Sequence, residues 1–167
     1  KKNNSSEIFL KIKDQKLNLK IKNINIYNVL ATLAVIHEFN LNLDHIKKTF
    51  KFSEPTEGRG KTHIISRYSK RFKLIDESYN ANPLSVKNAI NNFDLIKKDK
   101  FKKYLILGDM LELGHKSEKY HKDLSKVINN SNIDKVFIKG EKTLFTYKNL
   151  HKSKQGNILQ NKDDIDL

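Results

Sequence analysis

The sequence contains no cysteine and no tryptophan, and it has two prolines, six glycines and one methionine among 167 residues. The absence of cysteine excludes disulfide bonds and thiolate metal sites, and it agrees with a reducing, cytoplasmic environment. No apolar run approaches the roughly 20 residues that a membrane-spanning helix needs, and no signal peptide is visible. Because the only methionine is Met110, we expect the chain to be a piece of a longer protein.

Positive charge is abundant, since 33 lysine and arginine residues against 19 acidic residues give a net charge of +14. Such an excess is typical of proteins that bind nucleic acid. Only Arg59, Arg67 and Arg71 are arginines, however, and arginine is the side chain best suited to base readout and bidentate phosphate contacts. The lysines are spread through every predicted element, which favours a solvated basic surface. A basic α/β module that binds nucleic acid stays open as an alternative.

Three apolar segments indicate buried strands in successive strand–loop–helix units. The predicted strands are 72–75, 104–107 and 136–138, and the predicted helices follow Asn82 and Ser117. Asn82 suits a helix cap and Pro83 the first helical position, while Ser117 is a predicted cap for the next helix. Apolar residues recur at helical spacing behind both positions. Such a succession predicts right-handed crossovers and a Rossmann-like α/β fold with a mostly parallel sheet.

The first 57 residues have a different pattern. The predicted strands are 8–12 and 17–21, joined by a turn at Asp14–Gln15, and the predicted helices are 27–39 and 43–50. A hairpin and two helices make a poor core by themselves. The turn-rich segment 53–58 indicates a hinge, so we predict two domains, 1–57 and 58–167.

Two polar loops follow the first two predicted strands of the C-terminal part. Residues 74–83 read LIDESYNANP, and residues 108–114 read GDMLELG. Ligands in open α/β sheets bind at such carboxyl ends of strands, so we expect both loops to border one crevice. The two loops resemble the C-terminal domain of the Mur ligases. The resemblance covers roughly residues 8 to 140, including 25–31, the Gly58-Arg59-Gly60 run and His121.

The resemblance implies that residues 1–57 end a central ATP-binding domain, and that 58–167 form the C-terminal domain without its last strand and helix. It also implies a cytoplasmic, monomeric enzyme of peptidoglycan synthesis. That enzyme would use ATP and Mg²⁺ to join D-alanyl-D-alanine to a UDP-N-acetylmuramoyl-tripeptide. No G-x-x-x-x-G-K-[ST] run occurs, so we expect the phosphate cradle and the principal magnesium ligands outside this chain, and no activity from the chain alone. Another Mur ligase or a folylpolyglutamate synthase relative is an alternative, against which the two loop sequences argue.

By the resemblance, five residues bind the nucleotide: Asn28, Arg59, Asp76, Glu77 and Asn80. Arg59, which lies between two glycines, is the predicted catalytic residue and would clamp the ATP phosphates; the alternative is a hinge arginine paired with an acid. Asp76 and Glu77 would orient a ribose or a metal-bound water, or else cap a helix. Glu77 stands where the family usually has aspartate.

Asn28 would contact adenine, or else form a buried hydrogen bond to the neighbouring hairpin. Just before it, Lys22 and Ile24 stand where the family commonly has glycine and histidine, so the adenine pocket is expected to differ from the family pattern.

Four residues are predicted to bind the substrate: Asn80, Asn82, Asp109 and Glu112. Of the two asparagines, Asn82 suits the helix cap better and Asn80 suits ligand contact. Asp109 and Glu112 lie in a glycine-bounded loop, which is either a mobile lid over an amine substrate or a solvated turn. His121 has no second ligand at metal spacing, so we predict a structural histidine and no metal site in this chain.

Overall fold

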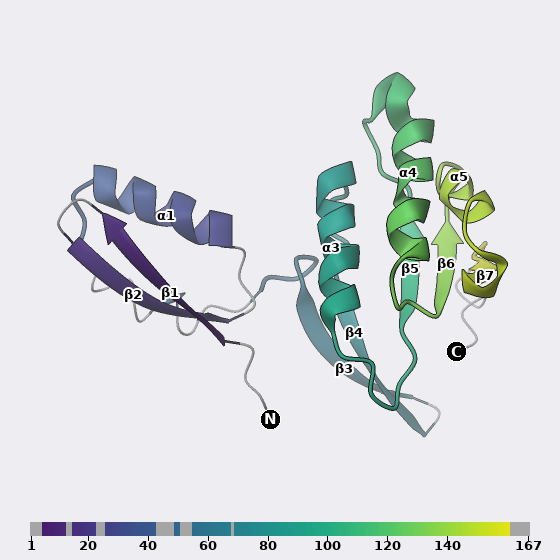
Figure 1. Ribbon diagram of the computed structural model, residues 1–167, viewed down its shortest axis with the longest axis horizontal. Helices are drawn as coiled ribbons and strands as arrows, with labels where there is room; N and C mark the ends of the chain where they lie inside the picture. The colour runs from purple at the N-terminus through teal and green to yellow at the C-terminus, as the bar shows by residue number, and fades with distance from the viewer. Residues whose placement is uncertain are drawn as a thin grey trace. The chain divides into compact units, whose positions relative to one another are not determined.

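The computed structural model describes residues 5–12, 15–22, 26–42, 49–50, 55–67 and 69–160, which belong to an α/β chain of two compact units (Figure 1). The first unit is Lys1–Tyr79 and the second is Asn80–Leu167. The predicted domain boundary after residue 57 remains a prediction. Within the described ranges, no helix is long and apolar enough to cross a membrane.

The first unit begins with a hairpin and a helix, as predicted. Strands β1 (Ser5–Ile12) and β2 (Gln15–Lys22) pair antiparallel, and helix α1 (Ile26–Glu38) packs on one face of them. The buried side chains are Leu17, Leu19, Ile21, Val29, Leu33 and Phe50. Every second residue of β2 points to this core, because side chains alternate across a strand. The second predicted helix, 43–50, lies outside the described residues except for Thr49 and Phe50, which are helical.

Helix α1 is less buried than its apolar sequence predicts. Only Val29 and Leu33 are buried, whereas Tyr27 keeps 76 % and Val35 57 % of its surface exposed. A strongly apolar helix over residues 27–39 is expected to be buried, and that expectation is wrong for the described structure. The reason is that α1 packs on the hairpin with only one face, and its apolar residues occupy other faces as well.

A second hairpin follows in the first unit. Strands β3 (Lys61–Arg67) and β4 (Lys70–Asp76) pair antiparallel, so that Lys61 lies opposite Asp76. The predicted strand 72–75 is confirmed as part of β4, but the prediction that it is buried and belongs to a parallel sheet is wrong. Leu74 keeps 41 % of its surface exposed, because β4 forms a two-stranded ribbon with β3. Strand β3 has no counterpart among the strands predicted from the sequence.

The second unit is a parallel sheet with helices. Its strands β5 (Tyr104–Gly108), β6 (Lys135–Lys139) and β7 (Gln155–Ile158) pair in that order. Helices α3 (Pro83–Leu95), α4 (Ser117–Asn129) and α5 (Thr143–Lys148) alternate with them, together with the short turns η1 (Gly114–Lys116) and η2 (Lys152–Lys154). The core contains Ile90, Leu107, Leu124, Ile128, Val136 and Ile138. The parallel sheet and the positions of two of its strands are as predicted, but the prediction that both strands are buried is wrong for β5, where Ile106 keeps 48 % of its surface exposed. Strand β7 was not predicted.

The two predicted helix caps have opposite outcomes. Asn82 caps α3 as predicted: its Oδ1 accepts hydrogen bonds from the backbone N–H groups of Leu84 and Ser85 at 3.1 and 2.9 Å. The Ser85 hydroxyl completes a capping box. Ser117 is not a cap, because the η1 turn runs directly into α4 and gives Ser117 helical angles.

Candidate functional site

In the first unit, the turn at Glu57–Gly60 is joined to the end of β4. The Gly60 N–H donates to the Asp76 carbonyl at 2.7 Å, and the Tyr79 N–H donates to the Gly58 carbonyl at 3.1 Å. Gly58 has a φ of +72°, and a Cβ there would lie 2.8 Å from the Tyr79 Cβ. The turn therefore needs glycine at position 58, since a larger residue would meet both strain and a clash.

Arg59 lies at the tip of this turn and packs on an aromatic ring. Its guanidinium carbon lies 4.2 Å from the centroid of the Tyr79 ring, in a cation–π contact. Among the described residues, no carboxylate pairs with Arg59, so the alternative of a hinge arginine paired with an acid is not what the structure has. An exposed cation held on a ring has its charge available to an anion.

Asp76 holds the turn in place. Its Oδ2 accepts from the Gly58 N–H at 3.1 Å and its Oδ1 from the Ser78 N–H at 3.0 Å. Hydrogen bonds from the side chain and backbone of Ser78 hold the pKa of Asp76 below its usual value. Asp76 is thus ionised and caps a turn, and not a helix. Its predicted contact with a ribose or metal-bound water remains a prediction.

Glu77, the next residue, has the opposite electrostatic character. Partial burial, followed by the charge of Asp76, raises the pKa of Glu77 above its usual value. Gly60 leaves room for this side chain, because a Cβ at position 60 would lie 3.2 Å from the Glu77 Oε1. The two adjacent carboxyl groups therefore differ in proton affinity.

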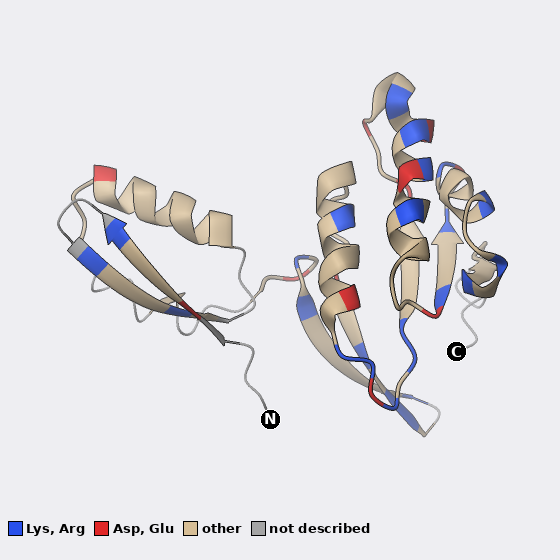
Figure 2. Cartoon of the chain, viewed as in Figure 1, with Lys and Arg blue, Asp and Glu red and all other residues tan. Residues whose placement is uncertain are grey.

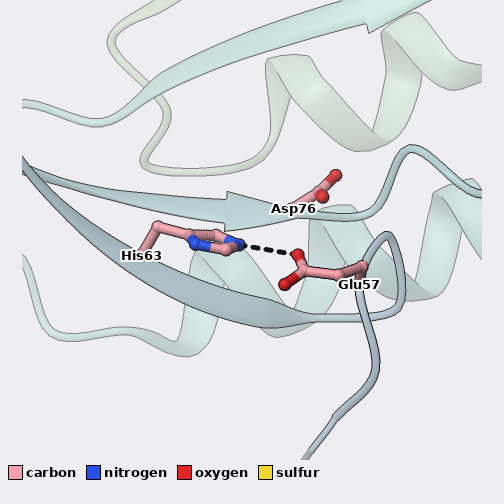
Figure 3. A group of neighbouring side chains, drawn as sticks. All are labelled: Glu57, His63 and Asp76. Atoms are coloured by element: carbon pink, nitrogen blue, oxygen red, sulfur yellow. Dashed lines mark ion pairs between the residues drawn. The ribbon is translucent and has the colours of Figure 1, made fainter.

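Two residues beside this turn were missed by the sequence analysis. The His63 Nε2 lies 3.1 Å from the Glu57 Oε2 (Figure 3). Lys61 forms a further ion pair with Glu57. The hydrogen bond from Lys61, outweighing the effect of burial, lowers the pKa of Glu57. Lys61 and His63 project from the same face of β3 because they are two residues apart. That spacing becomes informative only once residues 61–67 are known to form a strand.

The two asparagines predicted to bind ligand lie in the second unit. Asn82 uses its side-chain oxygen to cap α3. The Asn80 Oδ1 accepts from the Ala81 N–H at 2.8 Å, and Asn80 is exposed. Asn80 is the better placed of the two for a ligand, and both substrate roles remain predictions.

Asp109 ties its loop to the start of α5. Its Oδ1 accepts from the Thr143 N–H at 2.7 Å and its Oδ2 from the Lys142 N–H at 3.1 Å. Burial opposes ionisation of Asp109, but the backbone hydrogen bonds from Thr143 and Lys142 outweigh it and lower the pKa. The loop is therefore tied to α5 at Asp109, which is not a solvated turn, whereas the mobile lid and the substrate role of Asp109 remain predictions. Glu112 is exposed with a φ of +59°, and its substrate role remains a prediction.

His121 is a structural residue, as predicted. It is fully buried, its Nε2 accepts from the Met110 N–H at 3.0 Å, and its Nδ1 lies 2.8 Å from the Ser117 carbonyl. One ring nitrogen accepts and the other donates, which describes a neutral imidazole. His121 thereby holds the loop after β5 against α4.

Asn28, the predicted adenine contact, is exposed on α1. The alternative of a buried hydrogen bond to the hairpin is therefore wrong, because α1 buries only one face, and the adenine contact remains a prediction. The side chain of Lys22 and all of Ile24 lie outside the described residues, so the predicted difference in the adenine pocket remains a prediction.

Comparison with known proteins assigns the chain to a family. The family model described as "Mur ligase, glutamate ligase domain" matches residues 60–160. The chain belongs to the Mur ligase family. Its relatives include the UDP-N-acetylmuramoyl-tripeptide--D-alanyl-D-alanine ligases of Bacillus subtilis and Buchnera aphidicola, which are 30 % and 33 % identical over 83 % and 84 % of this chain. The chain spans 30 % and 29 % of the length of these two relatives.

Solved structures share the fold of this Mur ligase chain. MurF from Acinetobacter baumannii covers 92 % of it with a TM-score of 0.73 at 23 % identity, and 33 % of that protein is matched. MurF ligase from Thermotoga maritima, solved in complex with ADP, covers 93 % of it with a TM-score of 0.71 at 20 % identity, and 34 % of that protein is matched.

The Mur ligase domain also contains a buried cation that the sequence analysis placed on the surface. Lys103 is 1 % exposed, and its ammonium donates to the carbonyls of Phe93 and Asp94 and to the Asn132 Oδ1 at 2.9, 3.0 and 2.6 Å. Burial lowers the pKa of Lys103. Lys103 binds the carbonyl end of α3, which carries the negative end of the helix dipole. Many other basic residues lie on strands and helices of both units (Figure 2).

Proposed function

We propose that the chain is the C-terminal part of an ATP-dependent ligase that adds D-alanyl-D-alanine to a UDP-N-acetylmuramoyl-tripeptide during peptidoglycan synthesis. The observation that carries this proposal is that curated relatives 30 % and 33 % identical to the chain are named for this reaction. The exposed Arg59 on the Tyr79 ring supports it, because such a cation suits a nucleotide phosphate.

The proposed reaction has two steps. The terminal carboxylate of the tripeptide attacks the γ-phosphorus of ATP, which gives an acyl phosphate and releases ADP. The amine of D-alanyl-D-alanine then attacks the acyl carbon, so that an amide forms, phosphate leaves and the amine loses a proton. Catalysis of this kind depends mainly on positioning and charge stabilisation.

Arg59 is the residue to which we assign charge stabilisation in the first step. Its guanidinium would face the phosphates while Tyr79 holds it in place and Asp76 fixes the turn beneath it. Mg²⁺ would neutralise phosphate charge when bound, and we expect its principal ligands outside this chain. For the nucleotide we retain Asn28, Asp76, Glu77 and Asn80, and for the dipeptide Asn80, Asn82, Asp109 and Glu112.

The proposal includes the organisation of the protein. Residues 1–57 would end an ATP-binding domain and residues 58–167 would form the C-terminal domain of a monomeric, cytoplasmic enzyme. Since the chain spans 30 % of the Bacillus subtilis relative, we expect the phosphate cradle in a part of the enzyme that this chain does not include. The chain alone should therefore show no ligase or ATPase activity.

A chimeric enzyme tests the proposal. The segment of the Bacillus subtilis relative that aligns with this chain is replaced by the 167 residues, and phosphate release is measured with ATP, Mg²⁺, the tripeptide substrate and D-alanyl-D-alanine. We expect release only when all are present, and none from the relative lacking the segment or from the chain alone. A folded chimera without activity, or one that needs no dipeptide, would contradict the proposal.

A further inference from the structure

We propose that Glu57, His63 and Asp76 form a binding site for a divalent transition-metal ion, of which Zn²⁺ is the best-suited example. Each residue offers one ligand atom, and these atoms all lie within 4.8 Å of one another (Figure 3). The principal magnesium ligands of the proposed reaction are expected outside this chain, whereas these three residues belong to it. The inference does not depend on the ligase activity.

The donor set is the first argument for this ion. One imidazole nitrogen and two carboxylate oxygens suit Zn²⁺, which binds such atoms at about 2.0–2.2 Å and accepts water as a fourth ligand. Two ligands of a tetrahedral Zn²⁺ are thus about 3.3 Å apart. The His63 Nε2 and the Glu57 Oε2 are already 3.1 Å apart. The ligand oxygen of Asp76 lies within 4.8 Å of the ligand atoms of His63 and Glu57, so a small side-chain movement brings it to the same ion.

Glu57, His63 and Asp76 span 19 positions of the sequence, and the strand register explains why their side chains come together. Lys61 lies opposite Asp76 in the β3–β4 ribbon, and His63 is two residues further along β3 on the same face as Lys61. His63 and Asp76 are therefore diagonal neighbours, which long side chains can bridge. Glu57 approaches from the turn before β3. The prediction that this chain has no metal site considered only the spacing of ligands along helices, whereas this arrangement depends on β3, a strand that was not predicted.

Hydrogen bonds from neighbouring groups orient two of the three residues, Asp76 and Glu57. Asp76 accepts from the N–H groups of Gly58 and Ser78, and carboxylates that bind metals are commonly held by such contacts. Lys61 pairs with Glu57 and opposes the ion electrostatically. The competing arrangement is an ion pair between protonated His63 and Glu57, in which a proton occupies the place of the metal.

Isothermal titration calorimetry, in which ZnCl₂ is added to the complete, untagged 167-residue chain, tests the site. We expect one site per chain that takes Zn²⁺ in preference to Mg²⁺. Glu57→Gln and His63→Gln should each weaken binding by at least about tenfold. His115→Gln is the matched control, because His115 is exposed on η1, outside this cluster, and this variant should bind as the parent does.

Nuclear magnetic resonance of the unmodified chain gives an answer that does not depend on variants. Zn²⁺ should shift the ring nitrogen resonances of His63 before those of the other described histidines. Failure of the chain to bind Zn²⁺, undiminished binding by His63→Gln, or an unchanged His63 ring at saturating Zn²⁺ would each overturn the proposal. Thermal unfolding without Zn²⁺ confirms that the variants are folded.

Discussion

Replacing the buried Lys103 by methionine should lower the free energy of unfolding of the second unit by about 2 kcal/mol. Methionine keeps the length of the aliphatic side chain, so the change removes the ammonium and its three hydrogen bonds with little loss of packing. The Phe93 carbonyl still accepts from the Ile96 N–H, and the Asp94 carbonyl from the Asn132 side-chain amide. The Asn132 Oδ1 loses its bond to Lys103.

The expected magnitude follows from the one acceptor that loses its bond, the Asn132 Oδ1, and from the charge removed at the end of α3. A buried acceptor left unsatisfied costs about 1–3 kcal/mol, and an ammonium at a helix C-terminus contributes up to about 2 kcal/mol. Burial lowers the pKa of Lys103, so relief of the desolvation cost offsets part of that loss. The remainder is about 2 kcal/mol, which in a chain of this size lowers the melting temperature by about 4–8 °C.

Urea titration, followed at the methyl resonances of Ile90 in α3 and Ile138 in β6, measures the effect in the core that Lys103 supports. Lys100→Met is the control, because Lys100 is exposed, and it should change the free energy of unfolding by less than about 0.5 kcal/mol. If Lys103→Met unfolds at the urea concentration of the parent, or if both variants lose equal stability, the structural role assigned to the ammonium is wrong.

Three further predictions concern Arg59 in the turn, Gly140 after β6 and Asp109 in the loop after β5. In the chimeric ligase, Arg59→Ala should lower the rate of steady-state phosphate release about 100-fold or more, and Arg59→Lys should recover only part of that rate. Arg71→Ala is the control and should have near-normal activity. Parent-like activity of a folded Arg59→Ala enzyme would argue against the role assigned to Arg59. Gly140→Ala should lower the free energy of unfolding measured in urea by at least about 2 kcal/mol, because φ is +122° and the new Cβ would lie 2.3 Å from the Asp109 Oδ1. Gly108→Ala is the control, because a Cβ at position 108 meets no atom within 4 Å. Because the pKa of Asp109 is lowered in the folded chain, ionised Asp109 stabilises the fold fully above its unfolded-state pKa near 4, and this stabilisation is lost as pH falls through the folded-state pKa. The free energy of unfolding of Asp109→Asn should therefore depend less on pH in that acidic range. An unchanged pH dependence would contradict this role of Asp109.

Local patterns predicted much of the second unit. The start of α3 follows from Asn82 and Pro83, whose effects are confined to one helical turn. Strands β5 and β6 follow from uninterrupted apolar runs, and β6, the central strand, has the burial that such a run predicts in a parallel sheet. Strand β5 lies at the edge of the described sheet and is mostly exposed. Such signals depend on the residues themselves and not on distant partners.

Other features depend on contacts that no local pattern contains. Strand β7 has the polar sequence QGNI and forms by pairing with β6. The apolar run in β4 resembles a buried parallel strand, but its antiparallel pairing depends on the unpredicted β3. Lys103 looks like every other lysine until the carbonyl end of α3 is placed beside it. The Glu57–His63 contact likewise requires the β3–β4 ribbon.

Identification of the product made by the chimeric enzyme tests the proposed function most directly. Because the matching family model is described as a glutamate ligase domain, D-glutamate is the informative competitor. The enzyme receives ATP, Mg²⁺, the tripeptide substrate and equal concentrations of D-alanyl-D-alanine and D-glutamate, and the product is weighed by mass spectrometry. We predict a single product that is heavier by the dipeptide residue, whereas addition of glutamate, or no product from a folded chimera, would contradict the assignment.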